Sequence, residues 1–253
     1  MMSTTLAAAC DAGVLTLKLD SPQTSNALSR ALVDALHEAL AGAENDPTVN
    51  AILLCASGKN FCAGLDLKFL LERPRAEQEP YLRRVLELFQ RIWRQPQPVV
   101  AAVNGAALAG GFDLAAFCDL RIAADDASFA QTEILVGLTQ IVHPLYKSIG
   151  LAHAKELALL GDRISAHDAY RIGLVNRVVP SSELLVRAKE MAAVLASRPR
   201  EALFETKRLT RELIDLSTDK ALAEQAKTIA RRMASKEHAE RLQAMVARLG
   251  RTK

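Results

Sequence analysis

The chain has 253 residues, of which half are hydrophobic and 24% are charged. This composition can bury a large core, and it excludes a disordered or fibrous protein. The net charge of +3 is too small to indicate a nucleic-acid partner, although it favours the approach of a phosphate-bearing ligand. Aromatic residues make up only 4% of the chain, so we expect an aliphatic core that is rich in alanine.

The four cysteines lie far apart and form no C-x-x-C pair. Three of them sit in apolar stretches, so we expect reduced thiols in a cytoplasmic protein. No apolar run approaches about 20 residues, and the N-terminus lacks a charged start followed by an apolar core. The sequence therefore predicts a cytoplasmic location, with neither a membrane span nor a secretory signal.

Strand and helix patterns alternate along the first half of the chain. Strands are predicted where apolar and polar residues alternate, or where a short apolar run is continuous. Helices are predicted where apolar residues recur at helical spacing, the first of them after a possible cap at Ser29. The expected strands are 14–19, 51–56, 99–103 and 120–124, and the expected helices follow Ser29 and cover 81–94 and 110–117. This alternation indicates an α/β fold.

The last part of the chain changes character. It reads as helices broken near Pro199, Ser217 and Ser235, with no convincing strand. The apolar stripes of these helices need a cover, which is either the chain's own core or a neighbouring subunit. We therefore divide the chain into an α/β core, residues 1–195, and a C-terminal helical region, residues 196–253.

Two segments place small residues directly after a buried strand. They are 58–66, which reads GKNFCAGLD, and 104–113, which reads NGAALAGGFD. Glycine and alanine let a ligand approach the backbone, and two N–H groups that converge on one oxygen form an oxyanion hole. Each segment alone is more often a packing device, and neither fits a phosphate-binding glycine motif.

Together with the residues that follow, these segments resemble the enoyl-CoA hydratase/isomerase family, also called the crotonase family. The motifs that carry the resemblance are NFCAGLDL from Asn60, VNGAALAGG from Val103, CDLRIA from Cys118, FAQTEI from Phe129, LGDRISA from Leu160 and GLVNRVV from Gly173. The match runs in order from about Val14 to Pro180, and more loosely through the C-terminal helices.

The resemblance implies a crotonase-like spiral of repeated ββα turns, followed by helices that assemble a homotrimer or hexamer. It implies an enzyme whose substrate is an acyl-CoA thioester, so that coenzyme A belongs to the substrate and no separate cofactor is needed. We expect no metal, because no histidine or cysteine has a metal-ligand spacing, and no nucleic-acid or membrane partner.

The resemblance also implies roles for particular residues. The backbone N–H groups of Ala63 and Gly110 would form the oxyanion hole for the enolate of the thioester. Glu133 lies at the position of the family's main acid/base, and Asp113 at that of its second carboxylate. The residues expected to bind substrate are Ala63, Gly64, Leu65, Asp66 and Gly110.

Two departures from the family pattern concern the acyl end of the site. Hydratases usually carry glutamate where this chain has Asp113, which is shorter by one methylene and could hold a water badly. Aspartate there resembles the dienoyl-CoA isomerase branch, but that branch expects a second aspartate where this chain has Ile141. Residues 137–144 (GLTQIVHP) are bulkier than the usual Pro-Gly and glycines, so we expect a remodelled acyl pocket.

Several functional readings are open at this point. The first is an enoyl-CoA hydratase/isomerase. The second is another crotonase-type reaction on a CoA ester: decarboxylation, thioester hydrolysis or carbon–carbon bond formation. The third is a non-catalytic relative that binds RNA or CoA, which the lack of a dense basic stripe disfavours. His143 could act as a second base, but a packed or solvent-facing histidine is the favoured interpretation. Cys62 could act as a nucleophile, but a small buried spacer is the favoured interpretation.

Overall fold

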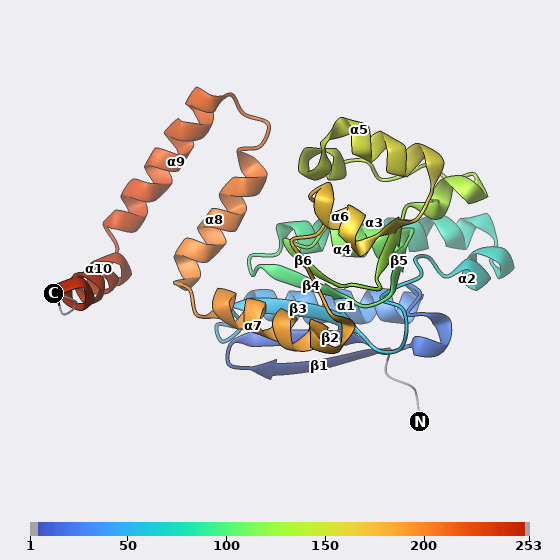
Figure 1. Ribbon diagram of the computed structural model, residues 1–253, viewed down its shortest axis with the longest axis horizontal. Helices are drawn as coiled ribbons and strands as arrows, with labels where there is room; N and C mark the ends of the chain where they lie inside the picture. The colour runs from blue at the N-terminus through green and yellow to red at the C-terminus, as the bar shows by residue number, and fades with distance from the viewer. Residues whose placement is uncertain (1–4, 251–253) are drawn as a thin grey trace. The chain divides into compact units, whose positions relative to one another are not determined.

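The structure is a computed structural model that describes residues 5–250 (Figure 1). By its internal contacts the chain divides after Ser197 into two compact units. The first unit is a mixed α/β structure, and the second consists of helices. The α/β fold predicted from the sequence is thus the fold observed.

A six-stranded sheet forms the base of the first unit. Its strand order is β1-β2-β3-β4-β6-β9, with β1 antiparallel to β2 and all other neighbours parallel. The strands are β1 (Leu6–Asp11), β2 (Val14–Leu19), β3 (Ala51–Ala56), β4 (Val99–Val103), β6 (Leu120–Ala124) and β9 (Arg177–Val179). The central β3 and β4 are almost wholly buried, which explains their continuous apolar sequences.

The first unit also contains a smaller, three-stranded sheet. It contains β5 (Ala106–Leu108), β7 (Ser128–Ala130) and β8 (Ile164–Ser165), in that order. Isolated parallel bridges join Cys62 to Ala107 and Leu28 to Leu65. The segments that follow β3 and β4 therefore lie side by side, although more than 40 residues separate Cys62 from Ala107 in the sequence.

Helices connect and cover these sheets. The helices of the first unit are α1 (Arg30–Asn45), α2 (Leu67–Glu72), α3 (Arg75–Arg94), α4 (Gly110–Ala116), α5 (Leu145–Leu160), α6 (Ala166–Arg171) and α7 (Leu184–Ala196), with short 3-10 turns η1 (Pro22–Thr24), η2 (Thr132–Val136) and η3 (Ser181–Glu183). The α7 helix packs on β3, β4 and β6, while α1 packs on β1, β2 and α3. Ser29 caps α1 as predicted, since its side chain accepts a hydrogen bond from the Leu32 N–H.

The predicted elements agree with the structure in most places. Each predicted strand is present, and α4 ends one residue before its predicted end. The α3 helix begins at Arg75, earlier than the expected residue 81, because its first turns are polar and show no apolar period. Strand β1 was missed, since its sequence LAAACD is short and alanine-rich and gains its structure from pairing with β2.

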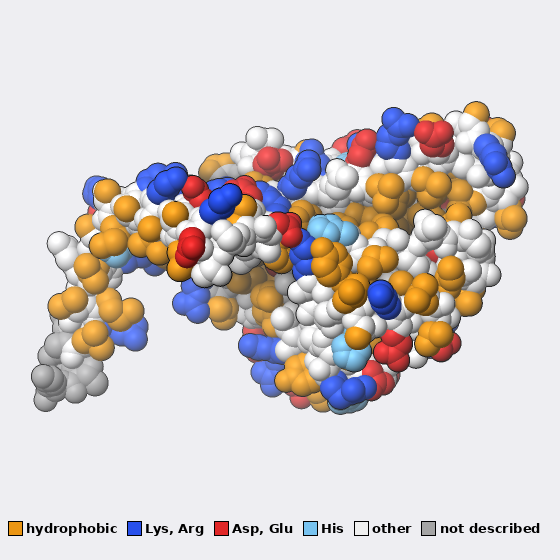
Figure 2. All heavy atoms as spheres, turned by 90° about the horizontal axis from the view of Figure 1, so that it is seen from above, with side chains coloured by type: hydrophobic (Ala, Val, Ile, Leu, Met, Phe, Trp, Pro, Cys, Tyr) orange, Lys and Arg blue, Asp and Glu red, His pale blue; other side chains and the backbone are white. Residues whose placement is uncertain are grey.

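The second unit contains α8 (Arg200–Glu212), α9 (Thr218–Met233) and α10 (Lys236–Gly250). The breaks between them fall close to the predicted residues Pro199, Ser217 and Ser235. Apolar side chains stay exposed along α9 and α10, among them Leu222, Ile229, Met233, Leu242, Met245 and Val246, and such side chains appear as orange spheres on this unit in Figure 2. Among the described helices, none is both long and apolar enough to span a bilayer.

A buried arginine holds the C-terminal end of α4 in place. Arg121 on β6 is only 7% exposed, and its guanidinium donates to the main-chain oxygens of Ala115, Ala116 and Cys118. Its Nε donates to the main-chain oxygen of Leu174. The last carbonyls of a helix have no partner within the helix, so a buried cation that binds them stabilises the helix end.

We expect Arg121→Met to lower the free energy of unfolding by about 3 kcal/mol, because it leaves several buried carbonyl oxygens without donors. Chemical denaturation followed by circular dichroism would measure this loss. Arg83→Met is the matched control, since Arg83 makes an exposed ion pair with Glu79 and contributes little. Equal stability of the two variants would contradict the role assigned to Arg121.

Candidate active site

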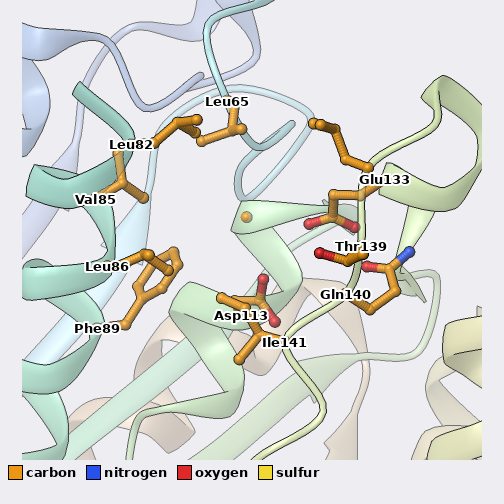
Figure 3. A pocket seen from close by; sticks show the side chains of 12 residues that line it. Leu65, Leu82, Val85, Leu86, Phe89, Asp113, Glu133, Thr139, Gln140 and Ile141 are labelled. Carbon is orange, nitrogen blue, oxygen red and sulfur yellow. The ribbon is translucent and has the colours of Figure 1, made fainter. Parts of the chain in front are cut away.

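A cavity of about 250 Å³ lies between α3, the start of α4, η2 and the segment 138–141 (Figure 3). One wall is apolar and comes mainly from α3. The opposite side carries the polar groups of α4, η2 and the segment 138–141. The lining residues are Leu65, Leu82, Val85, Leu86, Phe89, Gly110, Asp113, Glu133, Leu138, Thr139, Gln140 and Ile141. An apolar cavity with a few polar groups is the usual form of a small-molecule site.

The two predicted carboxylates meet in this cavity. Asp113 lies in the first turn of α4, and Glu133 lies in η2, directly after β7. Figure 3 shows both carboxyl groups on the polar side, across from the α3 side chains. One oxygen of each, Asp113 Oδ2 and Glu133 Oε2, is buried and has no hydrogen-bond partner within the described part of the chain. Such atoms are available to a water molecule or to a substrate.

Burial raises the pKa of both carboxyl groups, and more strongly that of Asp113. Asp113 is 2% exposed, and this burial, together with the negative charge of Glu133, raises its pKa well above the usual value, against a hydrogen bond from Gln131 that lowers it. Glu133 is only partly buried; burial also raises its pKa, while its own backbone N–H and the Gln140 side chain lower it. Burial therefore opposes the charged form of Asp113 more strongly than that of Glu133.

The backbone N–H groups of Leu65 and Gly110 are among those next to the cavity that have no acceptor within the described residues. Gly110 is the first residue of α4, where an N–H lacks an intrahelical acceptor. The two amides are close, since a methyl group added at Gly64 would lie 3.0 Å from the Gly110 nitrogen. Both residues line the cavity.

The structure does not place Ala63 as predicted. Its N–H donates to the main-chain oxygen of Ser25 at 2.9 Å, and Ala63 does not line the cavity. The physical reason is that successive N–H groups of an extended backbone point in alternate directions. Because Ala63 pairs with the segment at Ser25, its N–H points away from the site. In the same segment, two residues later, the Leu65 N–H has no acceptor among the described residues.

The other residues predicted to bind substrate shape the backbone near the cavity. Gly64 has a φ of +94° and packs against Leu108 and Ala109, a contact that leaves no room for a side chain. Asp66 caps α2, with Oδ1 accepting from the Phe69 N–H. The backbone N–H of Asp66 donates to the Tyr81 hydroxyl.

The alternative nucleophile and base lie outside this arrangement. Cys62 is fully buried, and burial raises the pKa of its thiol to about 12, so it is not a thiolate at neutral pH. His143 does not line the cavity, and its ring lies 5.6 Å from that of Tyr146. Cys62 is thus a buried residue, as a spacer would be, and His143 is a solvent-facing histidine.

The apolar wall was not predicted as part of the site. Leu82, Val85, Leu86 and Phe89 recur at helical spacing, which only indicated that this face of α3 is buried. In the segment expected to remodel the pocket, the lining residues are Leu138, Thr139, Gln140 and Ile141. The polar contacts of Gln140 had no signal in the sequence, since its partner is set by the fold.

Known proteins resemble this chain over most of its length. The family model described as enoyl-CoA hydratase/isomerase matches residues 9–250. The crotonyl-CoA hydratase of Syntrophomonas wolfei is 35% identical over 83% of this chain and 82% of its own, and the same figures hold for the short-chain-enoyl-CoA hydratase of Clostridium acetobutylicum.

Solved structures show the same likeness over nearly the full length. The crystal structure of enoyl-CoA hydratase from Mycobacterium smegmatis superposes with a TM-score of 0.92, at 38% identity and with 96% of each chain covered. The family model matches almost the whole chain, and the relatives are 35–38% identical to it. Together these matches assign the chain to one family. The chain belongs to the enoyl-CoA hydratase/isomerase family.

Proposed function

We propose that this enzyme adds water across the double bond of a short enoyl-CoA thioester, with Glu133 as the acid/base. The observation that carries the proposal is the meeting of two carboxyl groups and two unengaged backbone amides at one cavity. Family membership supports the general reaction on an acyl-CoA thioester. The residue roles below rest on the geometry of this chain.

The backbone amides of Leu65 and Gly110 are proposed to bind the thioester oxygen. When a nucleophile attacks the double bond, electron density moves onto this oxygen and an enolate forms. Two fixed N–H donors stabilise that charge where it appears, and one such donor typically contributes roughly 3–4 kcal/mol to the lowering of the barrier. This role passes from Ala63 to Leu65, because the Ala63 N–H already donates to Ser25.

Glu133 is proposed to move one proton within each turnover. As an ionised carboxylate, it takes a proton from water while the water oxygen bonds to the β-carbon. It then returns that proton to the α-carbon of the enolate, so that one water molecule is added and the enzyme is unchanged. The raised pKa of Glu133 suits this exchange, because an acid/base works best when its pKa lies near the working pH.

Asp113, with its carboxyl group in the neutral, protonated form, is proposed to hold the attacking water. A protonated carboxyl can both donate and accept a hydrogen bond, so it orients a water without adding a second negative charge. Migration of the double bond is the second candidate reaction, since it needs Glu133 alone. The observation in its favour is that Asp113 is one methylene shorter than the glutamate usual in hydratases.

A short acyl chain is favoured by the shape of the cavity. The side chains of Leu138 and Ile141 line the cavity, in a segment where the family usually has glycine or proline. The two curated relatives named above are described by short substrates, crotonyl-CoA and short-chain enoyl-CoA. The residues 196–253 are proposed to assemble a homotrimer or hexamer, supported by the exposed apolar side chains of α9 and α10.

Glu133→Gln is expected to lower kcat by about a thousandfold, because the amide cannot accept and return a proton. Stopped assays with crotonyl-CoA and with a 3-enoyl-CoA separate the two reactions: hydration lowers the absorbance of the conjugated thioester, and isomerisation raises it. Binding of the CoA ester should persist in the variant. Glu156→Gln, on the exposed face of α5, is the matched control, and unchanged turnover in Glu133→Gln would remove Glu133 from the mechanism.

Replacement of single backbone amides by esters tests the oxyanion donors. An α-hydroxy acid at position 65 or 110 removes one N–H and keeps the side chain, and we expect kcat to fall by roughly 100- to 1000-fold. The same change at position 63 removes the bond to Ser25 and should affect stability more than kcat. A large loss of kcat at 63 with none at 65 would restore the original assignment to Ala63.

Asp113→Asn is expected to raise the melting temperature by a few degrees at neutral pH while it lowers activity. The folded-state pKa of Asp113 lies above its unfolded value, so wild-type stability falls as the pH rises from about 4 toward that folded-state pKa. The asparagine side chain does not ionise, so the variant does not lose stability in this way as the pH rises. Melting curves between pH 4 and 8 should therefore diverge with rising pH, and parallel curves would contradict the buried, neutral Asp113.

A further inference from the structure

Backbone groups on both sides of the Leu65 N–H are held by hydrogen bonds. Before it, the main-chain oxygen of Gly64 accepts from the Leu28 N–H at 2.8 Å. After it, the Asp66 N–H donates to the Tyr81 hydroxyl at 3.0 Å. The amide that is proposed to bind the thioester oxygen therefore lies between two fixed points of the backbone.

The first of these bonds sets the direction of the Leu65 N–H. The Gly64 oxygen and the Leu65 N–H belong to one trans peptide group, in which C=O and N–H point in opposite directions. Since the Gly64 oxygen is directed at Leu28, the Leu65 N–H points away from that segment. This direction leaves it available to a ligand in the cavity that Leu65 lines.

The second bond is one half of a bridge made by the Tyr81 hydroxyl. Leu28 and Leu65 form a parallel bridge, in which the next bond would join the Asp66 N–H to the Leu28 oxygen. The Tyr81 hydroxyl binds both groups, since it accepts from the Asp66 N–H and donates to the Leu28 oxygen at 2.6 Å. It therefore sets how far the backbone at Asp66 stays from Leu28.

The Tyr81 side chain is itself held in place. It is 2% exposed, and its ring lies 4.8 Å from that of Phe69, at a tilt of 53°. Burial raises the pKa of the Tyr81 phenol to about 12, against the hydrogen bond from the Asp66 backbone, which lowers it. The hydroxyl is thus protonated at neutral pH and can donate one hydrogen bond while it accepts another.

We propose that Tyr81 is a positioning residue, whose hydroxyl holds the Leu65 N–H at the place where the thioester oxygen gains its negative charge. This inference rests on the proposed function, since it gives Tyr81 a task only if the Leu65 N–H binds that oxygen. Tyr81 is not among the described residues that line the cavity. It therefore acts through the backbone of Asp66 and Leu65.

Tyr81→Phe removes the hydroxyl and keeps the ring. The Asp66 N–H can then pair directly with the Leu28 oxygen, which draws the backbone beside Leu65 toward Leu28 and moves the donor. Because a misplacement of about 1 Å can cost roughly a hundredfold in rate, we expect kcat for the hydration of crotonyl-CoA to fall by about 10- to 100-fold. KM should change by less than about threefold, since the donor matters most in the transition state.

The infrared band of a bound thioester carbonyl gives a readout that a loss of stability alone would not move. Hydrogen bonds to the carbonyl oxygen weaken the C=O bond, so its band shifts to lower frequency on binding. Butyryl-CoA labelled with 13C at the carbonyl is the probe, because it has no double bond to hydrate. At saturation, the shift should be smaller with Tyr81→Phe than with the wild-type enzyme.

A backbone ester at position 66 tests the same link from the other end. Malic acid in place of Asp66 removes the N–H that donates to Tyr81 and keeps the carboxylate side chain and the Leu65 N–H. Its loss of kcat should be similar to that of Tyr81→Phe, and the two changes together should cost no more than either alone. This variant decides the question if Tyr81→Phe does not fold.

Tyr170→Phe is the matched control, because Tyr170 is exposed on α6 and does not line the cavity. It should keep the wild-type kcat and the wild-type carbonyl band. Melting curves establish that each variant is folded at the assay temperature. A folded Tyr81→Phe enzyme that keeps the wild-type carbonyl band, at whatever rate, would overturn the inference, and so would losses of kcat that multiply when the two changes are combined.

The outcome for the proposed function is separate. If the backbone ester at position 65 lowers kcat and Tyr81→Phe does not, Leu65 remains the oxyanion donor and only the role of Tyr81 fails. If the ester at position 65 keeps the wild-type kcat, the proposed donor fails, and the role of Tyr81 fails with it.

Discussion

The site depends on one close contact between two backbone segments. A methyl group added at Gly111 would lie 2.1 Å from the Cys62 main-chain oxygen, and one added at Gly105 would lie 1.9 Å from that of Lys59. No residue larger than glycine fits at such distances without a shift of the backbone. Because the chain can approach itself in this way, the amides of Leu65 and Gly110 come to the same side of one cavity, although they belong to different turns of the spiral.

Polar groups are built into an otherwise apolar core at a cost in stability. Asp113 is buried in the first turn of a short helix, and a buried carboxyl is costly to ionise. Arg121 offsets part of this cost at the other end of the same helix, where it binds the last carbonyls. The helix that carries a buried carboxyl at one end is thus stabilised at the other by a buried cation.

The sequence predicted the elements and the carboxylates better than it predicted their contacts. Strand and helix periods located β2, β3, β4, β6 and α4, and the family motifs led to Asp113 and Glu133 at one cavity. The choice of Ala63 failed because the motif has several small residues, and only pairing with a distant segment decides which N–H faces inward. Gln140 was considered only for its size, since its hydrogen-bond partner Gln131 is brought close only by the folded chain.

The Tyr81 hydroxyl has a consequence for selectivity. It donates to the Leu28 main-chain oxygen at 2.6 Å and accepts from the Asp66 N–H at 3.0 Å, so it joins α3 to the backbone beside Leu65. The same helix forms the apolar wall with Leu82 and Val85. A long acyl chain that pushed this wall outward would also pull on the backbone that presents the Leu65 N–H. Discrimination by chain length would then appear in the rate of the chemical step as well as in binding.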